Sequence, residues 1–310
     1  MKKNCVFGPV PSRRFGRSLG IDLVPLKVCS MSCAYCQLGK TAEPTLERKA
    51  YVTLEDVQRD LPGALERAGD FDVATFSGSG EPTLNSSLGD IIRYVKTKTR
   101  NPIVVLTNGT LLWMPEVRED LRVADVIAPS LDAATDEMLQ RLNRPAPGLD
   151  LEKIVSGMEE FSAEFAGEIR LEVFLADGVN DSEEHVAAIA SLARRIGPSR
   201  VELNTAERRP TEDWVRPVPY ERLLELATFF DPPADIISSR SSPDGAAHHS
   251  HEPSAEEILE YLARRPAPAV ELAKALGAPD DAVQALCEKL CTEGKLRAET
   301  MLEHEVFVVP

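Results

Sequence analysis

Short apolar segments rich in β-branched residues alternate with longer amphipathic segments over the first 230 residues of the chain. This alternation indicates repeated β/α units, in which parallel strands form one sheet and helices cover it. Six such units predict an α/β fold, a partial (β/α)6 barrel that is open on one side. We expect strands at residues 18–24, 72–77, 102–107, 123–131, 168–175 and 200–205. We expect helices at 54–67, 86–98, 115–121, 150–165, 182–195 and 219–230, with Thr53, Asn85 and Asp181 as N-caps.

The composition changes after residue 230. Residues 231–253 are rich in Pro, Ser, Gly and Asp, which is typical of a linker or flexible loop. Three helical segments and a final stretch able to form two short strands follow, and together they resemble a small winged helix-turn-helix α+β domain. The helices are expected at 254–264, 268–276 and 280–293, with Gly277 in the turn before the third. The predicted division is therefore a barrel at 1–230, a linker at 231–253 and a winged-helix-like domain at 254–310.

Charge is distributed unevenly. The net charge is −15, which argues against non-specific nucleic-acid binding, yet residues 1–50 carry nine Lys or Arg against three Asp or Glu. No apolar run approaches the roughly 18 residues that indicate a membrane span. The N-terminal segment lacks the apolar core of a secretory signal. We therefore expect a cytoplasmic protein that makes no membrane contact.

Three of the six cysteines lie close together, directly after the first predicted strand. Cys29, Cys33 and Cys36 have the spacing C-x3-C-x2-C, and thiolates on such a loop can bind three irons of one cubic cluster. The fourth iron then has no protein ligand and is open to a small molecule. A zinc site or three buried cysteines are the alternatives, but zinc needs a fourth ligand, and no further Cys or His lies nearby in the sequence.

Polar residues also follow the next three predicted strands. Residues 76–83 (FSGSGEPT) combine Gly80, which permits close backbone approach, with Glu81, whose carboxylate suits an ammonium group. Asn108 ends the third strand, and Ser130 and Asp132 end the fourth. Because the carboxyl ends of parallel barrel strands meet at one rim, where barrel active sites lie, we expect these residues beside the cysteines.

The cysteine triplet, with an aromatic residue before its last cysteine, resembles the signature of the radical S-adenosylmethionine (SAM) superfamily. Residues 79–82 resemble that family's GGEP segment, with Ser79 in place of its first glycine. The resemblance implies a radical SAM barrel and a [4Fe–4S] cluster that binds SAM at its open iron. It also implies reductive cleavage of SAM to a 5′-deoxyadenosyl radical that abstracts hydrogen from a substrate. The implied cofactor-binding residues are Tyr35, Ser79, Gly80, Glu81, Asn108, Ser130 and Asp132, and the catalytic metal ligands are Cys29, Cys33 and Cys36.

Segments 7–22, 35–39, 178–181 and 203–205 are similar to a subgroup of wyosine-synthase-related radical proteins, most without an assigned reaction. The resemblance covers about residues 5–230. Wyosine synthases modify transfer RNA and use a second cluster on three upstream cysteines, whereas this chain has only Cys5 upstream. The substrate therefore stays open between a small molecule and transfer RNA.

The basic residues near the N-terminus have three interpretations. Arg13, Arg14 and Arg17 are candidates to bind a phosphate-bearing substrate. The basic region is also suited to steer an acidic flavodoxin or ferredoxin-type electron donor to the cluster, or it is a solvated face. On the fifth and sixth strands, Arg170, Glu172 and Asn204 are candidates to face the barrel interior as substrate residues, and Arg170 and Glu172 alternatively pair with each other.

The C-terminal segment is acidic, with six Lys or Arg against eleven Asp or Glu in residues 254–310. A DNA-reading helix normally carries basic residues, so we expect no DNA contact and regard an iron–sulfur redox sensor with a winged-helix output as the non-enzymatic alternative. Cys287 and Cys291, one helical turn apart, are more typical of a helix core than of an auxiliary cluster. His248, His249 and His251 are either a metal-binding patch or part of a solvated linker.

Overall fold

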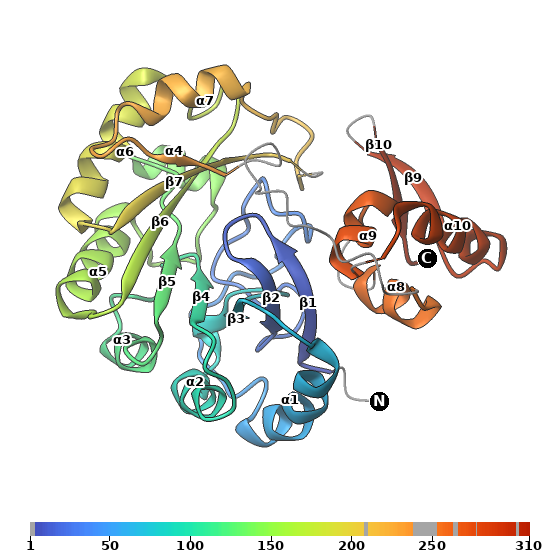
Figure 1. Ribbon diagram of the computed structural model, residues 1–310. Coiled ribbons are helices and arrows are strands. Elements are labelled where there is room, and N and C mark those ends of the chain that lie inside the picture. Colours follow the sequence, from blue (N-terminus) through green and yellow to red (C-terminus); the bar gives the residue numbers. More distant parts are fainter. Residues whose placement is uncertain (1–3, 208–209, 238–252, 263–265, 277, 302–303) are drawn as a thin grey trace.

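The computed structural model describes residues 4–207, 210–237, 253–262, 266–276, 278–301 and 304–310. An eight-stranded sheet forms its centre, and every strand pairs with the one before it in sequence (Figure 1). The strands are β1 (Val6–Ser12), β2 (Gly16–Ile21), β3 (Val73–Phe76), β4 (Ile103–Thr107), β5 (Val126–Pro129), β6 (Glu168–Leu175), β7 (Arg200–Thr205) and β8 (Asp235–Ile236). Strands β2–β8 are parallel and β1 is antiparallel to β2, so the sheet is the mostly parallel one expected of a partial barrel.

The six predicted strands correspond to β2–β7, whereas the sheet strands β1 and β8 were not predicted. β1 contains Pro9 and Pro11, which argue against a strand, yet an edge strand tolerates proline because one side needs no ladder hydrogen bonds. β8 has only two residues and lies inside the segment interpreted as a linker. That interpretation is therefore wrong at its start, where Ile237 also donates a backbone hydrogen bond to Leu203.

Helices follow the strands and cover the outer side of the sheet (Figure 1). They are α1 (Leu54–Ala68), α2 (Leu88–Lys96), α3 (Pro115–Leu121), α4 (Asp136–Leu142), α5 (Leu151–Glu164), α6 (Glu183–Ile196) and α7 (Tyr220–Ala227). The short helix α4 was not expected. Thr53 is the N-cap of α1 as expected, but Ser182, not Asp181, caps α6 with its side chain. Asn85 is not the cap of α2, because its amide donates to the carbonyls of Leu23 and Val52.

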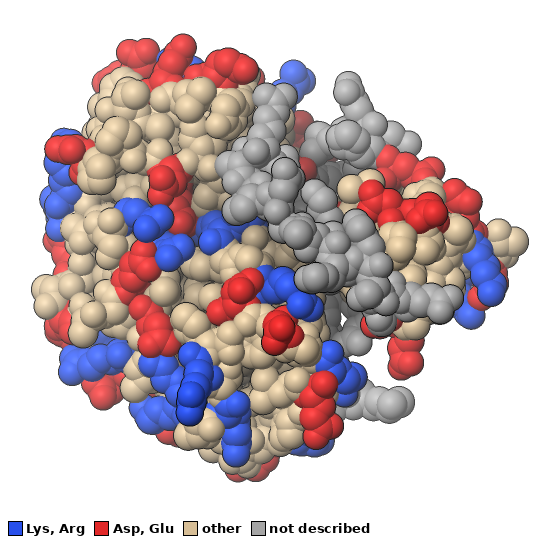
Figure 2. All heavy atoms as spheres, in the orientation of Figure 1, with Lys and Arg blue, Asp and Glu red and all other residues tan. Residues whose placement is uncertain are grey.

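The C-terminal segment contains the expected elements, which are the helices α8 (Ala255–Leu262), α9 (Ala269–Leu276) and α10 (Asp280–Thr292) and the antiparallel pair β9 (Arg297–Met301) and β10 (His304–Val308). Its buried residues, Cys287 among them, form a cluster separate from the barrel core, which supports the interpretation of Cys287 as a core residue. Helix α9 lies against the edge strand β1, where Val10 packs on the same cluster. Figure 2 shows acidic side chains on the visible surface of this segment.

The winged-helix assignment and the domain boundaries stay predictions. Gly277 and the three histidines of the predicted linker lie outside the described residues. Among the helices that are described, none is both long and apolar enough to cross a membrane.

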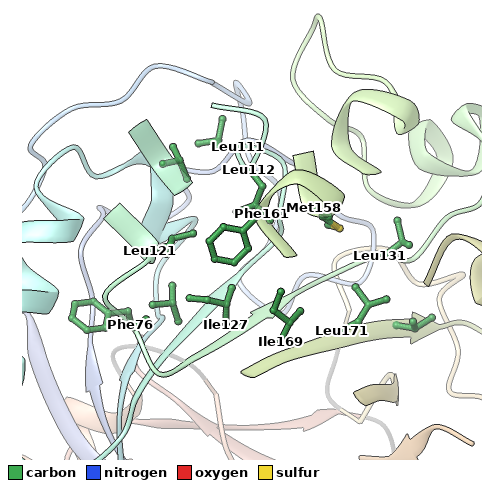
Figure 3. Packing of buried hydrophobic residues seen from close by; sticks show 14 of the residues in the cluster. Phe76, Leu111, Leu112, Leu121, Ile127, Leu131, Met158, Phe161, Ile169 and Leu171 are labelled. Carbon is green, nitrogen blue, oxygen red and sulfur yellow. The ribbon is translucent and has the colours of Figure 1, made fainter. Parts of the chain in front are cut away.

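The main core lies between the outer face of the sheet and the helices (Figure 3). Ile127 and Ile169 project from the neighbouring strands β5 and β6 toward Phe161 of α5. Phe76 of β3 belongs to the same cluster, and all four side chains are almost fully buried. Their alternate neighbours point to the inner face, where Phe15, Val73, Val104 and Val126 form a smaller apolar cluster. This alternation leaves the inner positions further along the strands for polar side chains.

Candidate functional site

The cysteine loop begins after β2 and is fixed by backbone hydrogen bonds to the segment that ends α4. Ser32 N donates to Asn143 O at 3.1 Å, and Ala34 N donates to Leu142 O at 2.8 Å. On the other side of the loop, Ala146 N donates to Ser30 O at 2.8 Å. The unexpected helix α4 therefore has a role, since its C-terminal end holds the backbone around the cysteines.

The three cysteines are free thiols and partly exposed, which fits ligands that must reach a cofactor. Burial, followed by the nearby Glu81 charge, raises the pKa of Cys29 to about 12, and burial raises the pKa of Cys33 well above its usual value. These thiols give up protons when they bind a metal. Among the residues with described positions, no three His, Cys, Asp or Glu side chains could hold one metal ion. A [4Fe–4S] cluster does not require three ligands on one ion, because each thiolate binds a different iron.

The predicted GGEP-like segment is locked against the start of the cysteine loop. Lys27 N donates to Ser79 O at 2.7 Å and Glu81 N donates to Val28 O at 3.0 Å. Glycine is needed between them, since a Cβ at Gly80 would lie 2.0 Å from Val28 O. The hydroxyl of Ser79 donates to the buried carboxylate of Asp22, so the serine that replaces the family's glycine has its own partner.

The carboxylate of Glu81 lies between the ends of β3 and β4. It accepts hydrogen bonds from Thr83 N and Oγ1, from Thr107 Oγ1 at 2.6 Å and from Asn108 N at 2.7 Å. Burial raises its pKa despite these donors. The Glu81 side chain therefore connects the loop after β3 with the loop after β4.

Asp132 connects the cysteine loop to β6. Its carboxylate accepts from Tyr35 Oη at 2.5 Å, from Asn143 Nδ2 at 2.6 Å and from Phe174 N at 2.8 Å. Burial raises its pKa to about 6. The Tyr35 ring stacks on Phe174 with centroids 3.9 Å apart, and Ser130 pairs with Glu172 through the backbone. The predicted cofactor residues thus meet at one rim.

The β1–β2 turn brings arginines to the inner face of β6 and β7. Arg14 forms ion pairs with Glu172 and, at 3.4 Å, with Glu202. Arg13 donates to Asn204 Oδ1 at 3.2 Å, and Asn204 donates to Glu172 Oε1 at 2.9 Å. Burial alone would raise the pKa of Glu172. The Arg14 charge and the hydrogen bond from Asn204 have the larger, opposite effect, so the pKa lies below its usual value.

Two of the candidate substrate residues lie elsewhere than expected, Arg17 outside this network and Arg170 at its edge. Arg17 is exposed, and its backbone N donates to Asp72. Arg170 does not pair with Glu172. Its guanidinium contacts Glu168 at 2.9 Å and Glu202 at 3.9 Å, and it lies over the Phe15 ring. The alternative of an Arg170–Glu172 pair is therefore wrong, because Arg14 from the unpredicted hairpin occupies Glu172 instead.

The sequence interpretation missed several residues that the structure brings to the site. Lys27 and Asn143 place nitrogens beside Cys36 and Cys33. Asn143 stands at the end of a helix just before an Arg-Pro pair, a signal of a helix end rather than of a site. No sequence pattern marks Lys27 as a site residue, because its side chain is placed beside Cys36 by a backbone φ of 64°.

His185 lies at the start of α6, where its Nε2 accepts a hydrogen bond from Ala134 N at 3.3 Å. Burial lowers its pKa, and a hydrogen bond to the Asp132 backbone offsets this only in part. The folded protein therefore binds fewer protons here than the unfolded chain. Neutral His185 should therefore contribute to the free energy of unfolding above about pH 6.5. This contribution should be lost as the pH falls from there through the lowered pKa of the folded state. Denaturant unfolding at several pH values should show a shallower acid-side slope for His185→Gln, and equal slopes would contradict this assignment.

Comparison with known proteins identifies the family. The radical SAM superfamily model matches residues 23–190. A UPF0026 protein of Synechocystis sp. is 41% identical over 221 residues, which cover 71% of this chain and 79% of the relative. A Brachyspira hyodysenteriae protein named GTPase Obg is 36% identical over 300 residues, 96% of this chain, but the chain spans only 44% of that relative's length.

The sequence of this chain lacks the complete phosphate-binding loop motif that is typical of a GTPase. Residues 39–41 are Gly-Lys-Thr, but Ala34 stands where the G-x4-G-K-[ST] motif has its first glycine. The motif also requires a helix directly after the loop, and residues 42–53 contain none.

Among solved structures, a radical SAM methyltransferase from Sphaerobacter thermophilus matches with a TM-score of 0.53 and 20% identity, covering 71% of this chain and 65% of that chain. This likeness shows the fold alone. Family model, relatives and fold agree with the cysteine loop and rim described above. The chain belongs to the radical SAM superfamily, whose enzymes use a [4Fe–4S] cluster and S-adenosylmethionine.

Proposed function

We propose that the protein binds a [4Fe–4S] cluster through Cys29, Cys33 and Cys36 and uses SAM to abstract hydrogen from a substrate in the barrel interior. One observation carries the proposal: three free thiols lie on one loop, and those of Cys29 and Cys33 accept hydrogen bonds from the rim segments around Glu81 and Asp132. When bound and reduced by one external electron, the cluster and SAM supply methionine and the 5′-deoxyadenosyl radical.

The polar inner face of β6 and β7 suggests which substrate fits. Arg14 is already paired with Glu172 and Glu202, and Arg13 with Glu207 at 3.1 Å. A phosphate would have to displace these carboxylates from the guanidinium groups, which would leave buried Glu202 with only the longer contact to Arg170 at 3.9 Å. We therefore favour a substrate that offers both hydrogen-bond donors and acceptors over one held by its phosphate charge alone.

The test is formation of 5′-deoxyadenosine. Anaerobically reconstituted protein with dithionite and SAM should produce it even without substrate, whereas Cys33→Ala should not exceed the level of a protein-free control. Equal amounts from both proteins, or none from either, would contradict the proposed function.

The close approach at Gly80 provides a second test. Gly80→Ala would force a Cβ into the Val28 carbonyl, a backbone atom that yields only if the two segments separate. We expect a loss of cleavage rate of about a hundredfold, the order expected for a displacement of about 1 Å at a reaction centre. Gly63→Ala is the matched control, because its Cβ meets only the flexible end of Arg67. Equal cleavage rates in the Gly80→Ala variant and the wild type would show that this segment does not position the cofactor.

Transfer RNA is the second candidate substrate, favoured by the wyosine-related segments 7–22 and 35–39. Against it, the face in Figure 2 shows Lys and Arg interspersed with Asp and Glu instead of one continuous basic surface. RNA that co-purifies with the protein and dissociates steeply with rising salt would support this candidate. Absent or salt-insensitive binding would exclude it.

The external electron is proposed to come from a flavodoxin or ferredoxin-type protein. Such a partner would approach the cluster loop, where Leu26 is 62% exposed one residue from Lys27. The C-terminal segment is proposed to adopt a winged-helix arrangement that contacts protein or substrate rather than DNA. Its third helix, α10, starts with Asp280 and Asp281, which would repel phosphates.

A further inference from the structure

Each of the three cluster cysteines has its own nitrogen donor, and the three donors come from three different segments. Asn108 Nδ2 lies 3.5 Å from Cys29 Sγ, Asn143 Nδ2 lies 3.7 Å from Cys33 Sγ, and Lys27 Nζ lies 3.2 Å from Cys36 Sγ. Two donors are neutral amides and one is an ammonium. Hydrogen bonds to the sulfurs and nearby charge are the main means by which a protein sets the potential of an iron–sulfur cluster.

The backbone of Lys27 is held in the geometry that points its side chain at Cys36. Its φ of 64° lies in the left-handed region, which costs a non-glycine residue on the order of 1 kcal/mol. The conformation persists because Lys27 N donates to Ser79 O and Val28 O accepts from Glu81 N. The ammonium is thus positioned by the same contacts that lock the GGEP-like segment to the cysteine loop.

The two amides are also fixed in orientation. The Asn108 oxygen accepts from Thr110 N at 3.1 Å and from Thr110 Oγ1 at 2.7 Å, which turns its NH2 group toward Ser30 and Cys29. Asn143 is 2% exposed, and its NH2 group donates to Asp132 as well as facing Cys33. Asn108, expected from the sequence as a cofactor contact, therefore directs its NH2 group to the sulfur of Cys29.

We propose that Lys27, Asn108 and Asn143 are positioning residues that hold the three thiolates and raise the reduction potential of the cluster. Reduction adds one negative charge, and an ammonium beside Cys36 stabilises the reduced state more than the oxidised state. The amide N–H groups act in the same direction by drawing electron density from the sulfurs. The inference rests on the proposed function only through the cluster that both require.

The decisive variants change Lys27 without disturbing its backbone. Lys27→Asn removes the charge, and asparagine tolerates positive φ well, so the loop should fold as before. Lys27→Arg keeps the charge and should largely restore the wild-type potential. Lys40→Gln is the matched control, since Lys40 lies four residues after Cys36 but is 67% exposed and pairs with Glu212 at 3.2 Å.

The measurement is a spectroscopic redox titration of the reconstituted cluster in each variant, with iron content as a second readout. For Lys27→Asn we expect the ratio of reduced to oxidised cluster at a fixed potential to fall about tenfold, which corresponds to about 59 mV for one electron. Asn108→Ala and Asn143→Ala should shift the potential in the same direction by less. Lys40→Gln should leave it unchanged.

Two results would overturn the inference. One is a Lys27→Asn cluster that assembles with full iron content and titrates at the wild-type potential. The other is an equal shift in Lys27→Asn and Lys40→Gln, which would mean that any positive charge on the loop has this effect. Failure of the proposed function looks different, because wild-type protein would then assemble no cluster or form no 5′-deoxyadenosine, whatever the variants do.

Discussion

Replacing Cys33 with alanine is expected to remove nearly all of the iron that the reconstituted protein holds, about four atoms per chain in the wild type. The same loss is expected for Cys29→Ala and Cys36→Ala, since no described His, Cys, Asp or Glu group offers a substitute site. Two remaining thiolates cannot hold a cubic cluster that already lacks a fourth protein ligand. Iron analysis and the visible absorption of the cluster measure the loss.

The matched control is Cys291→Ser, which changes a half-buried thiol in the C-terminal segment. It should retain all of the iron, because Cys291 and Cys287 lie on one helix whose inner side packs in an apolar cluster. Loss of iron in the control would indicate an auxiliary cluster in that segment. Retention of iron in Cys33→Ala would contradict the assignment of the triplet.

Arg14→Ala is expected to lower the free energy of unfolding by about 3–5 kcal/mol, the cost of removing one partner from a buried ion pair. Only 13% of the Arg14 side chain is exposed, and the two carboxylates that it pairs with are 18% and 4% exposed. Without the guanidinium, Glu172 would lose its ion pair with Arg14, and Glu202 would keep only the longer contact with Arg170 at 3.9 Å. Denaturant unfolding monitored by circular dichroism measures the change.

Arg17→Ala, on the same hairpin, is the control for this prediction. Its side chain is exposed, so the substitution should change stability by no more than about 0.5 kcal/mol. Combining Arg14→Met with Glu172→Gln and Glu202→Gln should recover much of the loss, because no unpaired charge then stays buried. Similar stabilities for Arg14→Ala and Arg17→Ala would show that the network does not support the fold.

The central strands β3, β4 and β5 were predictable because burial on both sides makes them apolar runs, whereas β6 shows alternating burial. β6 and β7 were predicted with the bounds that the structure shows, residues 168–175 and 200–205. The hairpin strand β1 was not, since its prolines and glycine mask an edge strand that only pairing with β2 reveals. The outer strand β8 is too short to leave any pattern.

The site was predictable where chemistry depends on spacing and not where it depends on contacts between distant segments. Cys29, Cys33 and Cys36 stand out because their spacing is rare, and the rim position of Glu81 follows from the strand before it. Lys27 and Asn143 do not stand out, since their roles arise from a left-handed backbone and from a helix end folded back onto the loop. Arg14 was noticed as a basic residue, but its two carboxylate partners lie 158 and 188 residues away in sequence.

The most direct test of the central claim is the electron paramagnetic resonance spectrum of the dithionite-reduced, reconstituted protein recorded with and without SAM. Three cysteine ligands leave one iron open, so SAM should bind there and change the spectrum of the reduced cluster, while Cys33→Ala should show no cluster signal in either sample. A wild-type spectrum that saturating SAM leaves unchanged would contradict the account.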